Sequence, residues 1–180
     1  MVNNEEVIGR TRKWITDVVI GCDFCPFAAR EVNAGRVRYT VDCCTDLATC
    51  LEALMRECRH LDENEDTATT LLILPAAFGD FEDFLELIDL AEQLLADQGY
   101  EGTYQIAGFH PEYRFAEAPD DDPANYTNRS VYPMLHLLRE EHVERAVDAH
   151  PDVEGIPERN IEFARKKGLE EMKRLRNACL

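Results

Sequence analysis

Apolar residues recur at intervals of three and four over several stretches of the chain, which is the period of an amphipathic helix. Residues 5–20 show this pattern, and Gly21 supplies a stop signal. The pattern returns over residues 45–61. It appears again after Asp80, a candidate N-cap, and continues to Gly99. The first hundred residues therefore predict three long helices, each with one apolar face.

Three short segments show strand patterns instead. Residues 36–42 alternate between apolar and polar side chains, as in a half-exposed strand. Residues 69–75 form a continuous apolar run, which is typical of a strand buried on both faces, and residues 103–109 form a third candidate. Long helices between these strands imply right-handed crossovers and parallel pairing. The sequence thus predicts one α/β domain of three layers, with a small, mainly parallel sheet of about three strands covered by helices.

The C-terminal third predicts further helices. The segment after Pro133 is interpreted as a helix which, together with the first helix, covers the remaining face of the sheet. Residues 156–180 contain seven basic and four acidic residues, whereas the whole chain carries a net charge of −17. This basic C-terminal helix is expected to dock on the acidic body of a single domain 1–180, or on a partner subunit. A merely solvated helix is the alternative.

Charge and cysteine content limit the function classes. The 36 acidic residues against 19 basic ones would repel a phosphate backbone and an anionic membrane surface, so neither nucleic acid nor membrane is an expected partner. No segment approaches the roughly 20 apolar residues of a membrane span, and the first residues lack the apolar core of a signal peptide. We therefore expect a cytoplasmic protein whose seven cysteines are mostly buried thiols, with Cys50 and Cys58 in the core.

Residues 122–132, DPANYTNRSVY, form a long polar segment after the third predicted strand. Ligands in open parallel sheets bind outside the carboxyl ends of the strands, and this loop leaves from that edge. The position predicts that the loop forms one wall of a small-molecule site. The alternative is a packed surface loop whose Asn and Asp side chains only close turns on themselves.

The polar loop also suggests what kind of molecule would bind. Asn125 and Asn128 offer amides, and Arg129 offers a planar fork of donors that matches a carboxylate or phosphate. The helix predicted after Pro133 would add free N–H groups and a partial positive charge. Together these features predict a small anionic ligand. For Arg129 alone, a salt bridge to one of the many acids is the alternative.

Cys25 and the histidines carry the candidate chemistry. Cys25 precedes Pro26, near a predicted helix start where the dipole stabilises a thiolate, so it is a candidate nucleophile or redox thiol. His110 follows the third strand and could act as an acid or base, whereas His136 falls in the first turns of the predicted helix. The alternatives are a small buried cysteine and packed histidines. A cluster of Cys25, His110 and His136 would suit zinc or copper, but no close-spaced ligand pair is present, so no metal ligands are assigned.

Three stretches, VVIGCDFCPFAAR, YQIAGFHPEYRFAEA and DDPANYTNRSVYPMLHLLREEHVERA, together resemble the bacterial family catalogued as domain of unknown function 1415. The resemblance extends over roughly residues 10–150. It implies a single domain of this size and brings no activity with it. The family pattern is similar to this chain at Cys25, Pro26, Phe27, Phe109, His110, Pro111, Tyr113, Phe115, Asn125, Thr127, Asn128, Arg129, Ser130, Pro133, His136 and Arg139.

Three hypotheses follow from these residues. The first is a small cytoplasmic enzyme acting on an anionic metabolite; the second is a non-catalytic protein that binds a small ligand or a metal; the third is an interaction module. No cofactor and no subunit number are predicted, and a homo-oligomer stays open. The candidate catalytic residues are Cys25 and His110, and the candidate binding residues are Tyr113, Asn125, Thr127, Asn128, Arg129, Ser130 and His136.

Overall fold

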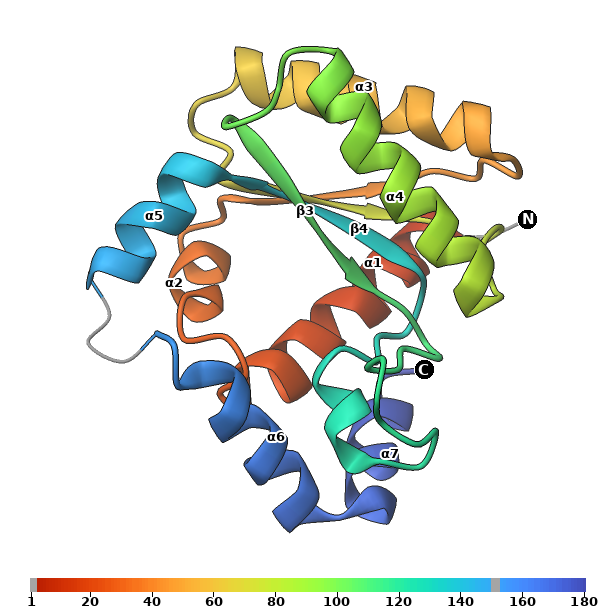
Figure 1. Ribbon diagram of the computed structural model, residues 1–180, viewed down its shortest axis with the longest axis vertical. Coiled ribbons are helices and arrows are strands. Elements are labelled where there is room, and N and C mark those ends of the chain that lie inside the picture. Colours follow the sequence, from red (N-terminus) through yellow and green to blue (C-terminus); the bar gives the residue numbers. More distant parts are fainter. Residues whose placement is uncertain (1–2, 150–152) are drawn as a thin grey trace.

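One mixed sheet of four strands forms the centre of the protein (Figure 1). The computed structural model describes residues 3–149 and 153–180. In the spatial order of the sheet, the strands are β1 (Val37–Val41), β2 (Thr69–Ile73), β4 (Met134–Arg139) and β3 (Tyr104–Phe109). β1 and β2 are parallel, and β4 is antiparallel to both of its neighbours. The three predicted strands therefore run in one direction, and a fourth strand is inserted in the opposite direction.

The helix predicted directly after Pro133 is wrong, because this segment is strand β4. The connection from β2 to β3 skips one strand position, and β4 fills the gap. Met134, Leu135 and Leu137 are fully buried, and together with the half-buried Leu138 they give β4 apolar side chains on both faces of the sheet. Such a strand has no alternation of apolar and polar residues, so its apolar run cannot be told from that of a buried helix by period alone. The helix begins only six residues later.

The helices that the sequence predicts in the first hundred residues are present. Asp46 and Asp80 cap α3 and α4, with their carboxylates accepting hydrogen bonds from first-turn N–H groups. The C-terminal segment forms two helices rather than one, because Gly168 interrupts it at a φ of 84° that favours glycine. The helical elements are α1 (Asn4–Trp14), the π-helical η1 (Ile15–Ile20), α2 (Ala28–Asn33), α3 (Leu47–Glu63), α4 (Phe81–Asp97), the 3₁₀-helical η2 (Pro123–Thr127), α5 (Glu140–Ala149), α6 (Ile156–Lys167) and α7 (Leu169–Asn177).

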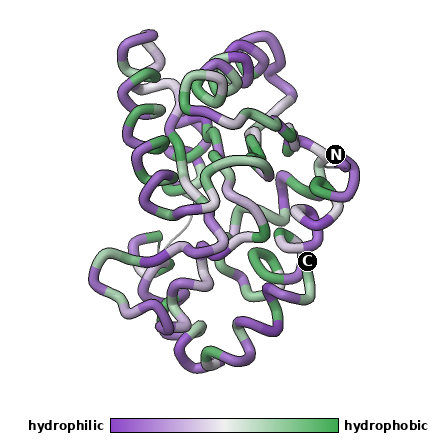
Figure 2. Tube along the Cα trace, turned by 90° about the vertical axis from the view of Figure 1, so that its right-hand side faces the viewer, coloured by the Kyte–Doolittle hydropathy of each residue, from purple (hydrophilic) through white to green (hydrophobic). Residues whose placement is uncertain are grey.

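Helices cover the two faces of the sheet unequally. α3 and α4 lie side by side over one face, and α1 crosses the other, with α2, α6 and α7 farther from the strands (Figure 1). Hydrophobic and hydrophilic positions alternate along the helices (Figure 2), as expected for elements with one buried face. No described helix is both long and apolar enough to cross a membrane. We call the two sides of the sheet the α3–α4 face and the α1 face.

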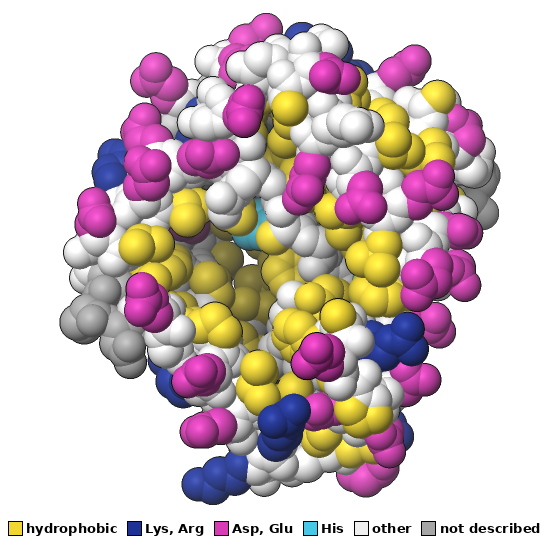
Figure 3. Space-filling view, in the orientation of Figure 1, with side chains coloured by type: hydrophobic (Ala, Val, Ile, Leu, Met, Phe, Trp, Pro, Cys, Tyr) yellow, Lys and Arg dark blue, Asp and Glu magenta, His cyan; other side chains and the backbone are white. Residues whose placement is uncertain are grey.

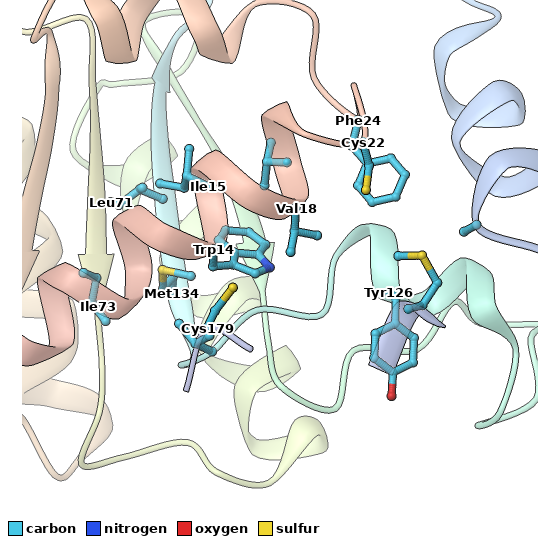
Figure 4. Packing of buried hydrophobic residues seen from close by; sticks show 14 of the residues in the cluster. Trp14, Ile15, Val18, Cys22, Phe24, Leu71, Ile73, Tyr126, Met134 and Cys179 are labelled. Atoms are coloured by element: carbon cyan, nitrogen blue, oxygen red, sulfur yellow. The ribbon is translucent and has the colours of Figure 1, made fainter. Parts of the chain in front are cut away.

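The core on the α1 face is built around Trp14, whose side chain is 1% exposed. Its ring meets Phe109 edge-on, with 5.2 Å between the ring centroids. Met134 of β4 and Cys179 from the C-terminal end lie beside it (Figure 4). The indole N–H donates a hydrogen bond to the carbonyl of Arg129 at 3.1 Å. The first helix, the sheet and the polar loop are thus joined at one buried residue.

The cysteines differ in part from the expectation of mostly buried thiols. Cys44 and Cys50 form a disulfide across six positions of the sequence, although Cys50 belongs to the helical stripe that predicts core packing. The bond arises because the fold brings the loop after β1 against the first turn of α3, a contact that the period of the helix does not reveal. Cys22, Cys58 and Cys179 are buried free thiols, as expected.

Candidate functional site

The loop over residues 110–133 begins and ends at the edge of the sheet where the sequence predicts a ligand site. In the register of the sheet, Phe109 pairs with Met134, Met134 with Ile73, and Ile73 with Val41. The carboxyl ends of β1, β2 and β3 therefore meet at one edge. The loop connects β3 to β4 across that edge, so the polar segment lies where the strand directions place it.

His110 fastens this loop to the one that follows β2. Its side chain is fully enclosed and packs against the rings of Phe81 and Phe84, at centroid distances of 5.2 and 5.0 Å. The Nε2–H faces the carbonyl of Phe78 at 2.8 Å, and Nδ1 accepts from the N–H of Glu112 at 3.0 Å. Burial lowers the pKa of His110. The imidazole is therefore neutral, and both of its nitrogens already have partners.

Asn125 organises the middle of the loop. It is fully buried, its amide oxygen accepts from the N–H of Phe115 at 3.1 Å, and its amide nitrogen donates to the carbonyl of Pro119 at 2.9 Å. The hydroxyl of Thr127 donates to the carbonyl of Ala124 at 2.9 Å and therefore closes a turn of η2. These two side chains hold the backbone of the loop in place.

Arg129 is likewise used inside the loop. Its Nε donates to the carbonyl of Tyr113 and its Nη2 to the carbonyl of Asp120, both at 2.9 Å. The guanidinium also lies over the ring of Tyr126, with its central carbon 4.9 Å from the centroid. The salt bridge considered as the alternative role of Arg129 is not among the ion pairs of the described residues. This cation stabilises a chain turn instead.

The remaining candidate binding residues also contact the loop. Burial raises the pKa of Tyr113, and a hydrogen bond with the side chain of Asn128 lowers it in part. Asn128 also accepts from the hydroxyl of Thr127, at 3.0 Å. Ser130 is fully buried and donates to the carbonyl of Tyr132. These contacts agree with the alternative to a ligand-binding wall, a packed loop whose polar side chains hydrogen-bond within the loop itself.

The C-terminal helices hold the loop from outside. Arg165 of α6 forms an ion pair with Asp122, the N-cap of η2, at 2.7 Å. The hydrogen bond from Arg165 lowers the pKa of Asp122. Arg176 of α7 donates to the carbonyl of Ser130 at 3.0 Å. The basic C-terminal segment thus docks on the loop of its own chain.

Two parts of the predicted anion pocket need correction. No helix begins at Pro133, so the helix N-terminus that was to face an anion is absent, because the segment is β4. His136 lies in the middle of that strand rather than in a first helical turn. The amides and the guanidinium predicted to hold an anion are engaged within the loop.

Cys25 lies apart from His110. It is half-buried and packs against the core on the α1 face, whereas His110 packs against Phe81 and Phe84 of α4 on the other side. The carbonyl of Cys25 accepts from the N–H of Ala28 at 3.2 Å, and α2 begins there, two residues after the predicted start. Among the described residues no hydrogen bond links Cys25 to His110 or Arg129. Their joint catalytic role stays a prediction.

The α1 face of β3 and β4 is only partly covered. Residues of β2 on this face, such as Leu71 and Ile73, are almost inaccessible because α1 packs on them. Ala107, Phe109 and Leu138 belong to the neighbouring strands and are only half-buried. In the space-filling view, the centre of the molecule is hollowed below the sheet, and mostly hydrophobic side chains surround the opening (Figure 3). We call this feature the central hollow.

His136 is the polar side chain that the register places on this open half-face. It pairs with Ala107 of β3 and Leu71 of β2, so its ring projects toward α1 rather than toward α3 and α4. The ring is half-buried and lies 6.0 Å from that of Phe109, centroid to centroid. Burial lowers its pKa to about 4. Neither ring nitrogen has a hydrogen-bond partner in the described part of the chain.

A second depression lies on the α3–α4 face, beside β1. It has a volume of about 410 Å³ and is lined by Arg38, Arg56, Glu57, Arg59, His60 and Glu63. Arg38 pairs with Glu57 at 2.7 Å, and Arg56 pairs with Asp42 at 2.7 Å. Because most of its charges are paired, this depression offers little net attraction for an ion. Nor do three or more His, Cys, Asp or Glu side chains of residues 3–149 and 153–180 converge as metal ligands.

The sequence prediction included His136 as a binding residue but missed the apolar side chains around it. No pattern within β4 alone marks these side chains; they are recognised only when β3 and β4 are known to be neighbouring strands, because residues two positions apart then share a face. One family model, described as Protein of unknown function (DUF1415), matches residues 6–174. No curated protein and no solved structure matches the chain.

Proposed function

Since the chain belongs to the family described as Protein of unknown function (DUF1415), whose description assigns no activity, we propose from its physical chemistry that it binds a small molecule in the central hollow. The ligand is mainly apolar and carries one hydroxyl or carbonyl group, which pairs with His136. One observation carries this proposal: a half-buried imidazole without a hydrogen-bond partner among the described residues lies on an otherwise apolar, open half-face. Ligand sites are typically apolar hollows with a few well-placed polar groups.

The protonation state of His136 limits the ligand. With a pKa of about 4, the ring is neutral at pH 7 and offers one donor and one acceptor but no charge. An anion would gain no direct charge attraction from it. The strongly acidic chain would further disfavour an anion. A neutral molecule with a polar end fits these properties better than the anionic metabolite expected from the sequence.

Two matched probes test the proposal. The compound 2-naphthol has a hydroxyl where 2-methylnaphthalene has a methyl group of similar size, so the pair isolates the hydrogen bond. Trp14, the single tryptophan, packs on Phe109 next to His136 and reports binding through quenching of its emission. We expect 2-naphthol to bind about fivefold more tightly, as one net hydrogen bond of about 1 kcal/mol implies.

A variant pair assigns this difference to one residue. His136→Leu keeps the approximate volume of the side chain and leaves a bound hydroxyl without a partner, so the preference for 2-naphthol should disappear or reverse. His60→Leu, on the opposite layer, should leave the difference unchanged. Failure of either probe to bind saturably, or a preference for 2-naphthol that survives in His136→Leu, would contradict the proposal. Circular dichroism and urea unfolding of each variant establish that it is folded.

The other two hypotheses have less structural support. An enzyme that uses Cys25 with His110 needs the two side chains to meet, and they pack against different cores. An interaction module that uses the polar loop and the basic C-terminal helices needs those groups exposed, and several of them bind each other instead. Ligand binding in the central hollow requires neither rearrangement.

A further inference from the structure

Three cysteines lie within eight residues where β1 ends and α3 begins. Cys44 and Cys50 are joined by the disulfide, and Cys43 beside them is an exposed free thiol. β1, α3 and β2 form a unit with parallel strands, so the disulfide links the carboxyl end of a strand to the first turn of the next helix. This arrangement is independent of the central hollow.

The two cysteines of the disulfide differ in exposure. Cys50 has no exposed surface, whereas Cys44 is 7% exposed and adjoins the exposed Cys43. The side of Cys44 is therefore the nearer approach for a thiolate from solution. The N–H of Cys44 is held by the carboxylate of Asp42 at 2.9 Å, and Asp42 is in turn paired with Arg56. The Arg56 guanidinium therefore offsets the negative charge of Asp42, which would otherwise repel a thiolate that approaches Cys44.

The helix favours Cys50 as the sulfur that leaves. Cys50 lies in the first turn of α3, a helix of 17 residues, and its own N–H already bonds the carbonyl of Asp46 at 3.2 Å. The partial positive charge at a helix N-terminus stabilises a thiolate in the first turn. The carboxylate of Asp46 opposes this effect, but it is occupied by the N–H and hydroxyl of Thr49. A good leaving group speeds thiol–disulfide exchange.

The buried cysteines differ in character. Cys22, Cys58 and Cys179 are enclosed, and burial raises the pKa of each thiol, for Cys58 to about 12. Such thiols are poor nucleophiles at neutral pH. Cys25 is half-buried and far along the chain from the disulfide. The group of Cys43, Cys44 and Cys50 thus combines an exposed thiol with a neighbouring disulfide in which Cys44, unlike Cys50, has some exposed surface.

We propose that Cys43, Cys44 and Cys50 form a thiol–disulfide exchange site for low-molecular-weight thiols of the glutathione class. In the first step a glutathione thiolate bonds to the Sγ of Cys44, the Cys44–Cys50 bond breaks, and the electron pair leaves on Cys50, which takes a proton from water. In the second step the Cys43 thiolate attacks the glutathione sulfur, and Cys44 leaves as a thiolate and is protonated.

A second glutathione thiolate completes the exchange. It attacks the glutathione sulfur now bound to Cys43, so oxidised glutathione is released and the Cys43 thiolate returns. Two glutathione thiols have then been oxidised to one disulfide, and the protein disulfide has been reduced to two thiols. Cys43 is unchanged at the end, so it affects the rate of the exchange and not its equilibrium.

The experiment follows the native full chain in glutathione buffers, with acid quenching, alkylation and mass spectrometry of the peptide that contains residues 43–50. We expect the disulfide to be reduced at a rate proportional to glutathione and insensitive to low urea concentrations, with the transient adduct on Cys44. In Cys43→Ser that adduct should persist at least tenfold longer, with the final ratio of oxidised to reduced protein unchanged. The matched control, Cys25→Ser, should behave like the unmodified chain.

Three results would overturn the proposal. Reduction only at the rate of global unfolding would make the disulfide purely structural. A first adduct on Cys50 would reverse the assigned direction of attack. If the adduct lifetime is unchanged in Cys43→Ser, then Cys43 does not take the glutathione from Cys44, and the proposed second step is wrong. None of these results depends on ligand binding in the central hollow, so the two proposals fail separately.

Discussion

The polar loop over residues 110–133 and the open half-face of β3 and β4 differ in whether their polar side chains already have hydrogen-bond partners. The loop contains amides, hydroxyls, a histidine and an arginine, yet Asn125, Arg129 and His110 all bind main-chain groups of their own chain. The half-face is mainly apolar, and its one histidine has both ring nitrogens free of protein partners in the described residues. The polar region thus uses these side chains to bind its own main chain, whereas the mainly apolar region contains an imidazole without a partner in the described residues.

The difference has a thermodynamic cause. A long loop at the edge of a sheet exposes many main-chain groups that no ladder satisfies, and a buried main-chain group without a partner costs as much as a lost hydrogen bond. Polar side chains in the loop meet that need. A strand in the sheet satisfies its own main chain, so its side chains stay available for a ligand. The informative substitutions are therefore those that distinguish a residue that stabilises the loop from a residue that binds a ligand.

The largest expected effect is that of Asn125→Ala in the scaffold. The change removes both hydrogen bonds of a fully buried amide and leaves a cavity in its place, which together should lower the free energy of unfolding by about 3 kcal/mol in urea titrations. The control is Asn177→Ala at an exposed position, expected within about 0.5 kcal/mol of the unmodified chain. A similar small effect for Asn125→Ala would mean that the loop does not need this amide.

The next largest effect is expected from lowering the pH, which should reduce the stability of the folded protein through His136. Its folded pKa of about 4 is below the ordinary value of 6.5, so the unfolded chain binds the proton more readily. The stabilising contribution is complete above pH 6.5 and is lost as the pH falls toward 4. Relative to His136→Leu, the unmodified chain should lose about 2 to 3 kcal/mol between pH 7 and pH 4.5.

Comparison of the two chains cancels the contributions of His110 and the carboxylates, because both chains contain them. Urea unfolding at the two pH values supplies the measurement. An equal loss in the unmodified chain and in His136→Leu would show that His136 is readily protonated in the folded protein. The neutral, unpaired state on which the ligand proposal depends would then be wrong.

Arg129→Lys distinguishes scaffold from anion site. Lysine keeps the charge but cannot reach the carbonyls of both Tyr113 and Asp120 in the planar geometry of a guanidinium. We expect unfolding to become easier by about 1 to 2 kcal/mol, with binding of 2-naphthol unchanged. If instead citrate stabilises the unmodified chain in thermal melts and this effect disappears in Arg129→Lys, the anion pocket predicted from the sequence gains support.

The smallest effect on stability is expected at Ala107, beside His136 on the open half-face. Ala107→Leu should change the unfolding free energy by less than about 1 kcal/mol, because the added atoms enter the central hollow, and it should weaken probe binding. At Gly108, which faces α4, an added Cβ would lie 2.5 Å from the Cδ1 of Ile88, a flexible side-chain end, and 3.1 Å from the ring of the fully buried Phe84, which has little room to move. Gly108→Ala should therefore cost about 1 to 3 kcal/mol. Equal costs at both positions would show that the half-face is not open.

The sequence predicted most of the fold because local patterns were strong. The alternation in β1, the apolar run of β2 and the capped stripe of α4 each reflect one element packing one face. β4 was misassigned because apolar side chains on both of its faces hide the alternation that marks a strand. Similarly, the disulfide between Cys44 and Cys50 depends on how a loop folds back on α3, which neither residue reveals alone.

The amino-acid sequence by itself determined the three co-directional strands, the helices between them and the edge from which the polar loop leaves. Periodicity and capping are local properties, so a single chain displays them without its fold. Only the tertiary structure decided which polar groups form hydrogen bonds within the protein and which remain unpaired. The partners of Arg129 and the isolation of His136 depend on segments distant in the sequence, and hydrogen-bond satisfaction is a property of the assembled molecule.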